Sequence, residues 1–328
     1  MTKPIRWGII GLGKIAEKFA NDLVKVPYTQ LHAVASTSIE RAQDFAQKFH
    51  VPYHYDSYQE IFKTPDLDVI YIATPHSLHA ENAILCLKNK MPVLCEKPFA
   101  MNLKEVQKMV DTARENDTFL MEAMWTRFIP VIQKTQELIA EDRIGKIKTI
   151  HADFGFVAPF TPERRTLNPA LGGGALLDIG IYPAYLSLLL LDYPTAIHAV
   201  STFGQTGVDE TTSFVFKYPQ ATALMNATFA SRTRTEALIY GEKGYIHLPE
   251  RFHESRTVVL YETDKDPITF TFERESRGYN FEIEEVNNCL RNNKKESVKM
   301  PLSMSVKLMS LLDEIRLKAG IKYDGIDD

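Results

Sequence analysis

Short apolar runs alternate with amphipathic stretches along the first part of the chain. Runs of strand length occur at Ile5–Ile10, Leu31–Ala35, Asp68–Ala73, Val93–Cys95 and Phe119–Ala123. The third run is almost continuously apolar, which is typical of a strand buried on both faces of a parallel sheet. The stretches between the runs, such as Ser77–Lys90, have helical length and spacing. Strands that alternate with helices predict an α/β fold with a doubly wound parallel sheet.

The pattern changes after residue 124. A helical stretch at Pro130–Glu141 is followed by many short alternating segments, and Phe281–Arg291 and Ser303–Ala319 have the pattern of closing helices. The alternating segments are His151–Val157, His198–Phe203, Ser213–Tyr218, Ala223–Phe229, Ala237–Tyr240, Tyr245–Leu248, Thr257–Glu262 and Ile268–Phe272. They predict a C-terminal α+β domain with a large, mainly antiparallel open sheet. We therefore predict two domains, residues 1–124 and residues 125–328.

A glycine motif follows the first strand immediately. Gly11, Gly13 and Ala16, with Lys14 and Ile15 between them, form G-x-G-x-x-A between a strand and a helix. The first glycine permits a tight turn, the second lets a pyrophosphate approach backbone N–H groups, and the small third residue permits close packing. The context predicts a dinucleotide-binding Rossmann domain, and the alternative is a tight turn that binds nothing.

The end of the second strand bears on the choice between NAD and NADP. An NAD site usually has an acidic residue there for the ribose, but this strand is followed by Ser36, Thr37 and Ser38, with Arg41 close behind. Hydroxyls, a helix N-terminus and an arginine suit a 2′-phosphate, so we expect NADP, with NAD possible. Alternatively, Thr37 and Glu40 have the spacing of a capping box and only start a helix.

Two further turns lie at carboxyl ends of predicted strands. Thr74-Pro75 ends the third strand and Glu96-Lys97-Pro98 ends the fourth. In a doubly wound sheet this edge forms the ligand crevice, although a solvated strand end would also carry charges. We expect His76 and His79, one turn apart, to act as hydrogen-bonding caps and not as a metal pair, because no Cys, Asp or Glu set accompanies them.

A glycine-rich segment lies within the second predicted domain. Gly172-Gly173-Gly174 leaves the backbone free to approach a ligand, and the helix that follows carries Asp178 and Tyr182 at i and i+4. An acid and a phenol on an apolar helix are costly to bury without a partner or a task. The alternative is that Tyr182 only hydrogen-bonds to Asp178 in the core.

Composition restricts the partners of the chain. With 328 residues, a net charge of −4 and 45% hydrophobic residues, the chain has no electrostatic footprint for nucleic acid or an anionic membrane. The apolar run Ala175–Leu191 is shorter than the roughly 20 residues that span a bilayer, so we expect a buried helix. Three scattered cysteines and a start without signal-peptide features favour a reduced, cytoplasmic protein with a small-molecule partner.

Together these motifs resemble the glucose-fructose oxidoreductase, inositol dehydrogenase and rhizopine-catabolism (Gfo/Idh/MocA) family over essentially the whole chain. The matching segments are Gly11–Ala16, Thr74-Pro75 with His79, Glu96-Lys97-Pro98, and Gly172–Gly174 with Asp178. Many members carry His at the position of Tyr182. This departure, Met121–Phe128 and Gly278–Val286 resemble the branch of dimeric dihydrodiol dehydrogenases and NADP-dependent xylose dehydrogenases.

The resemblance implies hydride transfer between a nicotinamide and a hydroxyl or carbonyl carbon of a sugar, polyol or cyclic diol. It implies that Lys97 and Tyr182 act at the reacting oxygen. We predict that Tyr182 donates or accepts the proton, because a nearby lysine charge lowers the phenol pKa, and that Asp178 on the same helix face helps to hold that charge. The residues implied at the cofactor are Thr74, Pro75, His79, Glu96, Trp125 and Arg127, and those on the substrate side are Phe154, Phe156 and Tyr279. Core packing is the alternative for the aromatic residues. Thr37 stands where this branch often has an arginine for the 2′-phosphate.

The resemblance also implies a homodimer or homotetramer formed through the second domain's sheet. Phe214, Phe216 and Tyr218 alternate with Val215 in the predicted strand Ser213–Tyr218, so both sheet faces carry apolar residues. Two other functions stay open: a lyase or glycosidase that uses a bound NAD for transient oxidation and cleaves a C–O bond, and a non-catalytic NADPH sensor.

Overall fold

The computed structural model describes residues 3–326, and the chain divides into two compact units. The first unit contains the chain up to Trp125 together with Arg274–Val306, and the second contains Thr126–Glu273 together with the chain from Lys307 onward. The first unit is therefore discontinuous in sequence and differs from a single division at residue 124. The reason is that helix α7 (Tyr279–Arg291) packs against helix α1 (Lys14–Leu23) of the nucleotide-binding fold.

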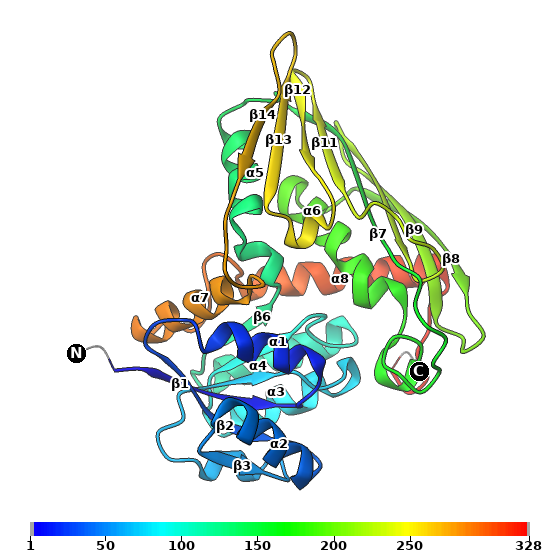
Figure 1. The fold of residues 1–328 in the computed structure, drawn as a ribbon. Coiled ribbons are helices and arrows are strands. Elements are labelled where there is room, and N and C mark those ends of the chain that lie inside the picture. The colour runs from blue at the N-terminus through cyan, green and yellow to red at the C-terminus, as the bar shows by residue number, and fades with distance from the viewer. Residues whose placement is uncertain (1–2, 327–328) are drawn as a thin grey trace. The chain divides into compact units, whose positions relative to one another are not determined.

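A parallel sheet forms the centre of the first unit (Figure 1). Within residues 3–326 this sheet has six strands in the order β3-β2-β1-β4-β5-β6, as expected of a Rossmann fold. The strands are β1 (Ile5–Ile10), β2 (Thr29–Ala35), β3 (Tyr53–Tyr55), β4 (Val69–Ile72), β5 (Val93–Glu96) and β6 (Leu120–Ala123), and the other helices are α2 (Ile39–Phe49), α3 (His79–Lys88) and α4 (Leu103–Glu115). The predicted doubly wound sheet is confirmed, but the sequence pattern missed the short edge strand β3.

The interior of this unit follows from the apolar spacing. Every residue of β4, β5 and β6 is buried, as expected of largely apolar strands in the centre of a parallel sheet, and the buried residues include Glu96 and Glu122. Helix α1 buries Ala16, Phe19, Ala20 and Leu23, which recur at helical spacing. The Trp7 indole Nε1 donates a hydrogen bond of 3.1 Å to Asn287 Oδ1 on α7. This buried bond joins the first strand of the sheet to a helix that lies far along the chain.

A large mixed sheet forms the second unit (Figure 1). In the described part of the chain it has eight strands in the order β14-β13-β12-β11-β7-β10-β9-β8, and only β7 and β10 pair in parallel. Its strands are β7 (Ile147–Gly155), β8 (Ala196–Phe203), β9 (Asp209–Lys217), β10 (Thr222–Thr228), β11 (Ala237–Gly241), β12 (Gly244–Leu248), β13 (Thr257–Glu262) and β14 (Ile268–Thr271). The predicted mainly antiparallel sheet is confirmed.

Helices cover one face of this sheet. Helix α6 (Ile181–Leu191) packs against β7 and β10, and α5 (Pro130–Ala140) packs against β13. A π-helix (Leu176–Gly180) precedes α6, and α8 (Leu302–Ala319) begins in the first unit and ends in the second. Short 3₁₀ turns occur at Glu60–Lys63, His76–Leu78, Trp125–Phe128, Pro169–Leu171 and Phe252–Glu254.

One helical stretch in the described residues, Pro169–Leu191, is long and apolar enough to cross a membrane by length and composition. Of its most apolar window, 83% is buried inside the structure. Such burial is typical of the core helix of a folded domain and agrees with the buried helix expected at Ala175–Leu191.

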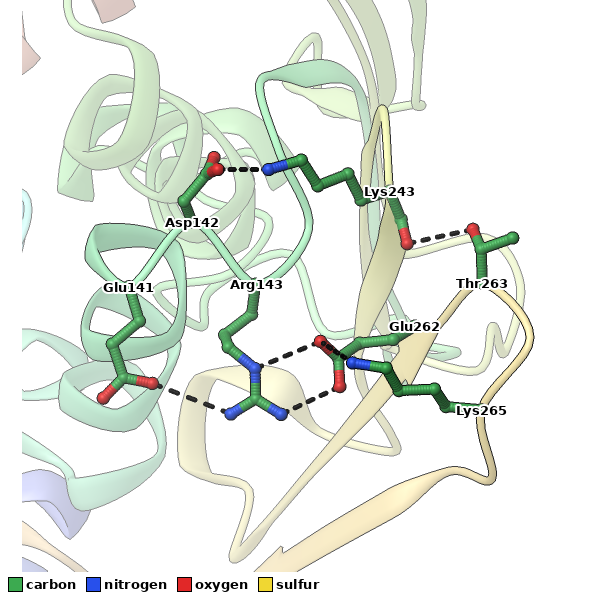
Figure 2. Close-up of polar contacts among 7 residues, drawn as sticks. All are labelled: Glu141, Asp142, Arg143, Lys243, Glu262, Thr263 and Lys265. Atoms are coloured by element: carbon green, nitrogen blue, oxygen red, sulfur yellow. Dashed lines mark hydrogen bonds and ion pairs between the residues drawn. The ribbon is translucent and has the colours of Figure 1, made fainter.

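A polar network fixes the end of α5 to the sheet in the second unit. Figure 2 shows the Arg143 guanidinium donating to both carboxylate oxygens of Glu262, at 3.2 and 2.8 Å. The Thr263 hydroxyl donates to the carbonyl of Lys243, whose ammonium pairs with Asp142. The hydrogen bonds from Arg143 lower the pKa of Glu262 to about 2. The loop after α5 is therefore tied to the ends of β12 and β13.

Candidate functional site

The turn after β1 has no room for a side chain at its first glycine. Gly11 has a φ of +84°, and a Cβ there would lie 2.6 Å from the Thr74 nitrogen and 2.8 Å from the Ala73 oxygen. The turns that follow β1 and β4 therefore lie directly against each other. Gly13 is the N-cap of α1, forms no side-chain cap, and has open space where a Cβ would stand. The first N–H groups of α1 thus fit a dinucleotide pyrophosphate.

The chain after β2 begins helix α2. Ser38 is the N-cap, and its hydroxyl accepts the N–H of Arg41 at 3.3 Å and donates to Glu40. The alternative of a capping box formed by Thr37 and Glu40 is therefore wrong, because the N-cap is Ser38, one residue later. The Ser36 side chain is buried and accepts the Ser38 N–H, whereas the Thr37 and Arg41 side chains are exposed. An exposed arginine in the first turn of a helix is placed to meet an anion.

The turn after β5 carries Lys97. The Glu96 carboxylate is buried and accepts hydrogen bonds from the Tyr71 hydroxyl and, at 3.1 Å, from the Lys97 N–H. The Lys97–Pro98 peptide bond is cis, and the Phe99 N–H that follows donates to Glu122 at 3.1 Å. Glu96 and Glu122 thus hold the turn from its two ends. In this arrangement Glu96, which the resemblance places at the cofactor, also positions the backbone of Lys97.

His79 connects two of these turns. Its side chain is fully buried, with Nδ1 at 2.8 Å from the Pro98 carbonyl oxygen and Nε2 at 2.9 Å from the Thr74 carbonyl oxygen. The His76 ring approaches His79 edge to face, with ring centroids 5.6 Å apart. Among the described residues no group of three or more His, Cys, Asp or Glu side chains is arranged to hold a metal. The ring of His79 therefore links the ends of β4 and β5, as a hydrogen-bonding residue does.

Trp125 and Tyr279 lie together in the first unit. Their rings stack with centroids 4.7 Å apart and planes 22° from parallel. Asp22 at the end of α1 accepts the N–H groups of Arg277, Gly278 and Tyr279 at 2.9 to 3.1 Å, which caps the N-terminus of α7. Tyr279, which the resemblance places on the substrate side, is therefore positioned by the nucleotide-binding fold. No pattern in the sequence indicated that Asp22 caps α7.

Asp178 lies in the π-helix of the second unit and pairs with an unexpected partner. The Arg165 guanidinium donates to both of its carboxylate oxygens, at 2.8 and 3.2 Å. A bidentate pair of this kind holds the carboxylate in one orientation. We expected a regular helix here, but the π-helix inserts one wider turn between the glycines and α6, as is frequent near functional sites.

Tyr182 lies in an aromatic cluster of the second unit. Its ring centroid is 5.7 Å from that of Phe154 and 4.9 Å from that of His253, and Phe154 stacks on His253 at 4.3 Å. Phe156 contacts both Phe154 and Phe229. The structure thus brings three predicted residues, Tyr182, Phe154 and Phe156, into one cluster. His253 was missed because it lies in a 3₁₀ turn without any periodic pattern.

The last of the three glycines before the π-helix packs against the protein itself. Gly174 has a φ of +127°, and a Cβ there would lie 2.2 Å from Asp209 Oδ1. Asp209 is fully buried and accepts the N–H of Leu176 and the hydroxyl of Thr212, both at 2.7 Å. Burial raises the pKa of Asp209 to about 6, against the lowering effect of these hydrogen bonds and of Arg316. At Gly174 the close approach is therefore made to Asp209, which anchors the helical segment that carries Asp178 and Tyr182.

Known proteins match the chain along nearly all of its length. A family model described as "Oxidoreductase family, NAD-binding Rossmann fold" matches residues 5–124, and one described as "GFO/IDH/MocA C-terminal domain" matches residues 132–247. The chain belongs to the GFO/IDH/MocA oxidoreductase family. The resemblance inferred from the motifs is thereby confirmed, and with it an NAD-binding Rossmann domain.

Relatives in this family include enzymes named trans-1,2-dihydrobenzene-1,2-diol dehydrogenase. The protein from Danio rerio is 37% identical over 332 residues, covering 97% of this chain and 98% of that protein. The protein from Homo sapiens is 34% identical over 330 residues, with coverage of 97% and 98%.

Solved structures of the family share the fold. The aldose-aldose oxidoreductase from Caulobacter crescentus, complexed with glycerol, has a TM-score of 0.88 at 22% identity and covers 97% of this chain and 98% of its own. A 3-ketoreductase from Actinomadura kijaniata, in complex with NADP and TDP-benzene, has a TM-score of 0.87 at 24% identity with the same coverage.

We predict that Gly174→Ala destabilises the second unit through contact with Asp209. The added Cβ overlaps a buried carboxylate that is held by two hydrogen bonds. The matched control is Gly207→Ala, which also has a positive φ but has no atom within 4 Å of the added carbon. In urea unfolding, the free energy of unfolding should fall by about 2 kcal/mol more in Gly174→Ala than in the control, which is the usual effect of overpacking. Equal losses would mean that backbone strain alone requires the glycine.

Proposed function

We propose that this protein is an NADP-dependent dehydrogenase or reductase that acts on a hydroxyl-bearing carbon of a cyclic diol or sugar. The family establishes an oxidoreductase with an NAD-binding fold. The observation that carries the proposal is the N-terminus of α1, which is open at Gly13 and has no side-chain cap. An anion fits there, at the same sheet edge as the Lys97 turn.

The residues of the first unit would hold the cofactor as follows. The N–H groups after Gly13 bind the pyrophosphate, and Ser36, Thr37, Ser38 and Arg41 surround the adenosine ribose and its phosphate. Thr74, Pro75 and His79 shape the crevice. When bound, the nicotinamide donates or accepts a hydride. Trp125, which stacks on Tyr279, supplies a flat apolar surface suited to the cofactor. The family resemblance also assigns Arg127, a residue of the second unit, to the cofactor.

Lys97 and Tyr182 have the proton-transfer and polarising roles in this proposal. An ordinary phenol has a pKa of about 10, so it needs a nearby cation to accept a proton from an alcohol at neutral pH. The Lys97 ammonium polarises a carbonyl oxygen during reduction, and Tyr182 donates or accepts the proton. Asp178 is held by Arg165, so its first task is to orient the π-helix that precedes Tyr182.

The aromatic cluster supports a ring-shaped substrate. Tyr182 is flanked by Phe154 and His253, whose faces suit the apolar face of a carbocycle or a pyranose. The relatives named above carry trans-1,2-dihydrobenzene-1,2-diol in their names, which favours a cyclic diol. His253 adds an imidazole that can hydrogen-bond to a hydroxyl, so a polyhydroxylated ring is also compatible.

We predict that Tyr182→Phe lowers kcat by about 100-fold, the usual effect of a positioned acid or base, and leaves NADPH binding unchanged. Lys97→Met should lower kcat further. Both variants and the unaltered protein are assayed by nicotinamide absorbance with a panel of cyclic diols, aldoses and dicarbonyls. NADPH binding is measured by fluorescence, and Phe156→Leu, which perturbs the cluster without removing a titratable group, is the control.

Other outcomes of this assay would contradict the proposal. Substrate conversion by bound NAD with no net absorbance change would indicate the lyase or glycosidase. Tight NADPH binding with no turnover on any substrate would indicate a sensor. Near-normal turnover of Tyr182→Phe with an unchanged pH profile would remove Tyr182 from proton transfer.

We predict that Arg41→Ala raises the NADP dissociation constant by about 10-fold or more, because a hydrogen bond to a charged group contributes about 1.5 to 3 kcal/mol. The NAD dissociation constant should stay nearly constant. Isothermal titration with both cofactors measures the two changes, and Lys48→Ala near the other end of α2 is the control for net charge. Equal use of NAD and NADP by the unaltered protein would refute the preference.

We also propose a homodimer or homotetramer formed through the face of the large sheet that the helices leave uncovered. A row across this face contains His198, Val215, Leu224, His151, Leu238, His247 and Val259, each aligned with the next. Val215 and Leu224 are 39% and 44% exposed at the centre of neighbouring strands. Exposed aliphatic residues on an uncovered sheet face favour self-association.

We predict that Val215→Lys and Leu224→Lys together convert the protein to a single-chain mass. Two lysines in an apolar interface leave charges buried and unpaired. Light scattering at micromolar concentration measures the mass, and Val298→Lys, at an exposed valine of the first unit, is the control. A single-chain mass for the unaltered protein would contradict the proposed oligomer.

A further inference from the structure

Glu122 lies beneath the Lys97 turn and has no role in the function proposed above. It is the penultimate residue of β6, is paired with Cys95 of β5, and is only 1% exposed. Its Oε1 atom accepts the Phe99 N–H at 3.1 Å. Phe99 is the second residue after Lys97, so this bond fixes the far end of the turn.

The charges around Glu122 come from several elements. Lys97 and Glu96 come from the end of β5, the Phe99 N–H comes from the turn, and the Ser305 hydroxyl comes from α8. Ser305 lies near the carboxyl group without forming a hydrogen bond of good geometry. Burial raises the pKa of Glu122 to about 7, while Ser305, the Phe99 N–H and the Lys97 charge lower it and Glu96 raises it. With a pKa of about 7, the Glu122 carboxyl group is half ionised at neutral pH and becomes fully ionised as the pH rises further.

We propose that Glu122 is a positioning residue for Lys97: it holds the Lys97–Pro98–Phe99 turn through the Phe99 N–H and supplies a countercharge to the Lys97 ammonium. The inference rests on the proposed function, in which Lys97 must stay protonated while it acts. The same carboxylates act on the Cys95 thiol. Burial, followed by the charges of Glu96 and Glu122, raises the pKa of this thiol well above the ordinary value.

Two substitutions separate the two parts of this role. Glu122→Gln has the same shape and keeps an oxygen that can accept the Phe99 N–H, but it removes the charge. Glu122→Ala removes both. The matched control is Glu105→Gln, because Glu105 also accepts a backbone N–H in this segment, that of Met101 at 3.0 Å.

The test measures Lys97 directly. Lysines are reductively methylated with ¹³C, the Lys97 signal is assigned by its loss in Lys97→Met, and its pKa is read by NMR titration. Glu122→Gln should lower the Lys97 pKa by about one unit or more, as loss of a nearby opposite charge does. The alkaline limb of the kcat profile should move to lower pH by the same amount, with KM for NADPH nearly constant. Glu105→Gln should change none of these quantities.

A second readout follows the turn. Hydrogen exchange of the Phe99 amide should be about 10-fold faster in Glu122→Ala, since loss of about 1.4 kcal/mol of protection is a tenfold change, and nearly normal in Glu122→Gln. An unchanged Lys97 pKa in Glu122→Gln would overturn the proposal even if that variant is less active. If the pKa and exchange rates change while activity does not, Glu122 positions Lys97 as inferred, and the catalytic role of Lys97 is what fails.

Discussion

Parallel pairing of β1, β4 and β5 is the constraint on which the first unit depends. Because the carboxyl ends of parallel strands meet at one edge, three turns that are far apart in sequence must share a small volume. Gly11 has no space for a Cβ against Thr74, and His79 spans the carbonyl oxygens of Thr74 and Pro98. The glycine motif therefore serves the packing of the protein as well as the approach of a cofactor.

Burial of acidic groups is the second theme of the first unit. Glu282 on α7 is fully buried, and neither of its carboxylate oxygens has a hydrogen-bond partner among the described residues. Burial, followed by the charges of Glu96 and Asp22, raises the pKa of Glu282 well above the ordinary value. Burial without a partner therefore favours the protonated form of this carboxyl group. Close to it, the Tyr71 hydroxyl donates to Glu96, and burial together with that carboxylate raises the pKa of the phenol.

The sequence predicted the elements well and the contacts between side chains poorly. Strand and helix patterns report burial, which is a local property, so the runs at Ile5–Ile10 and Ala237–Tyr240 coincide closely with β1 and β11. The edge strand β3 was missed because three half-exposed residues give no periodic signal.

Of the candidate site, the motif residues could be chosen from type and spacing, but their partners could not. Arg165 reaches Asp178 from a loop, His253 reaches Tyr182 from a 3₁₀ turn, and Asp209 meets Gly174 from the start of β9. None of these residues belongs to a repeating pattern, because loops obey tertiary packing and not a local period. The same limit applies to Gly172–Gly174. The three glycines indicated a close approach to the backbone, but the sequence did not show that the approaching atom at Gly174 is Asp209 Oδ1.

The discontinuity of the first unit has a consequence for how the protein is made. Asp22 caps α7, and Trp7 bonds to Asn287, so the nucleotide-binding fold is complete only when a segment more than 250 positions later is available. During synthesis the N-terminal segment leaves the ribosome long before α7. Trp7 and Asp22 therefore lack their hydrogen-bond partners until the whole second sheet has been translated. Chaperone dependence of the nascent chain is the expected cost of this arrangement. A fragment ending near residue 125 would lack the helix that closes its core, and should aggregate where the full chain does not.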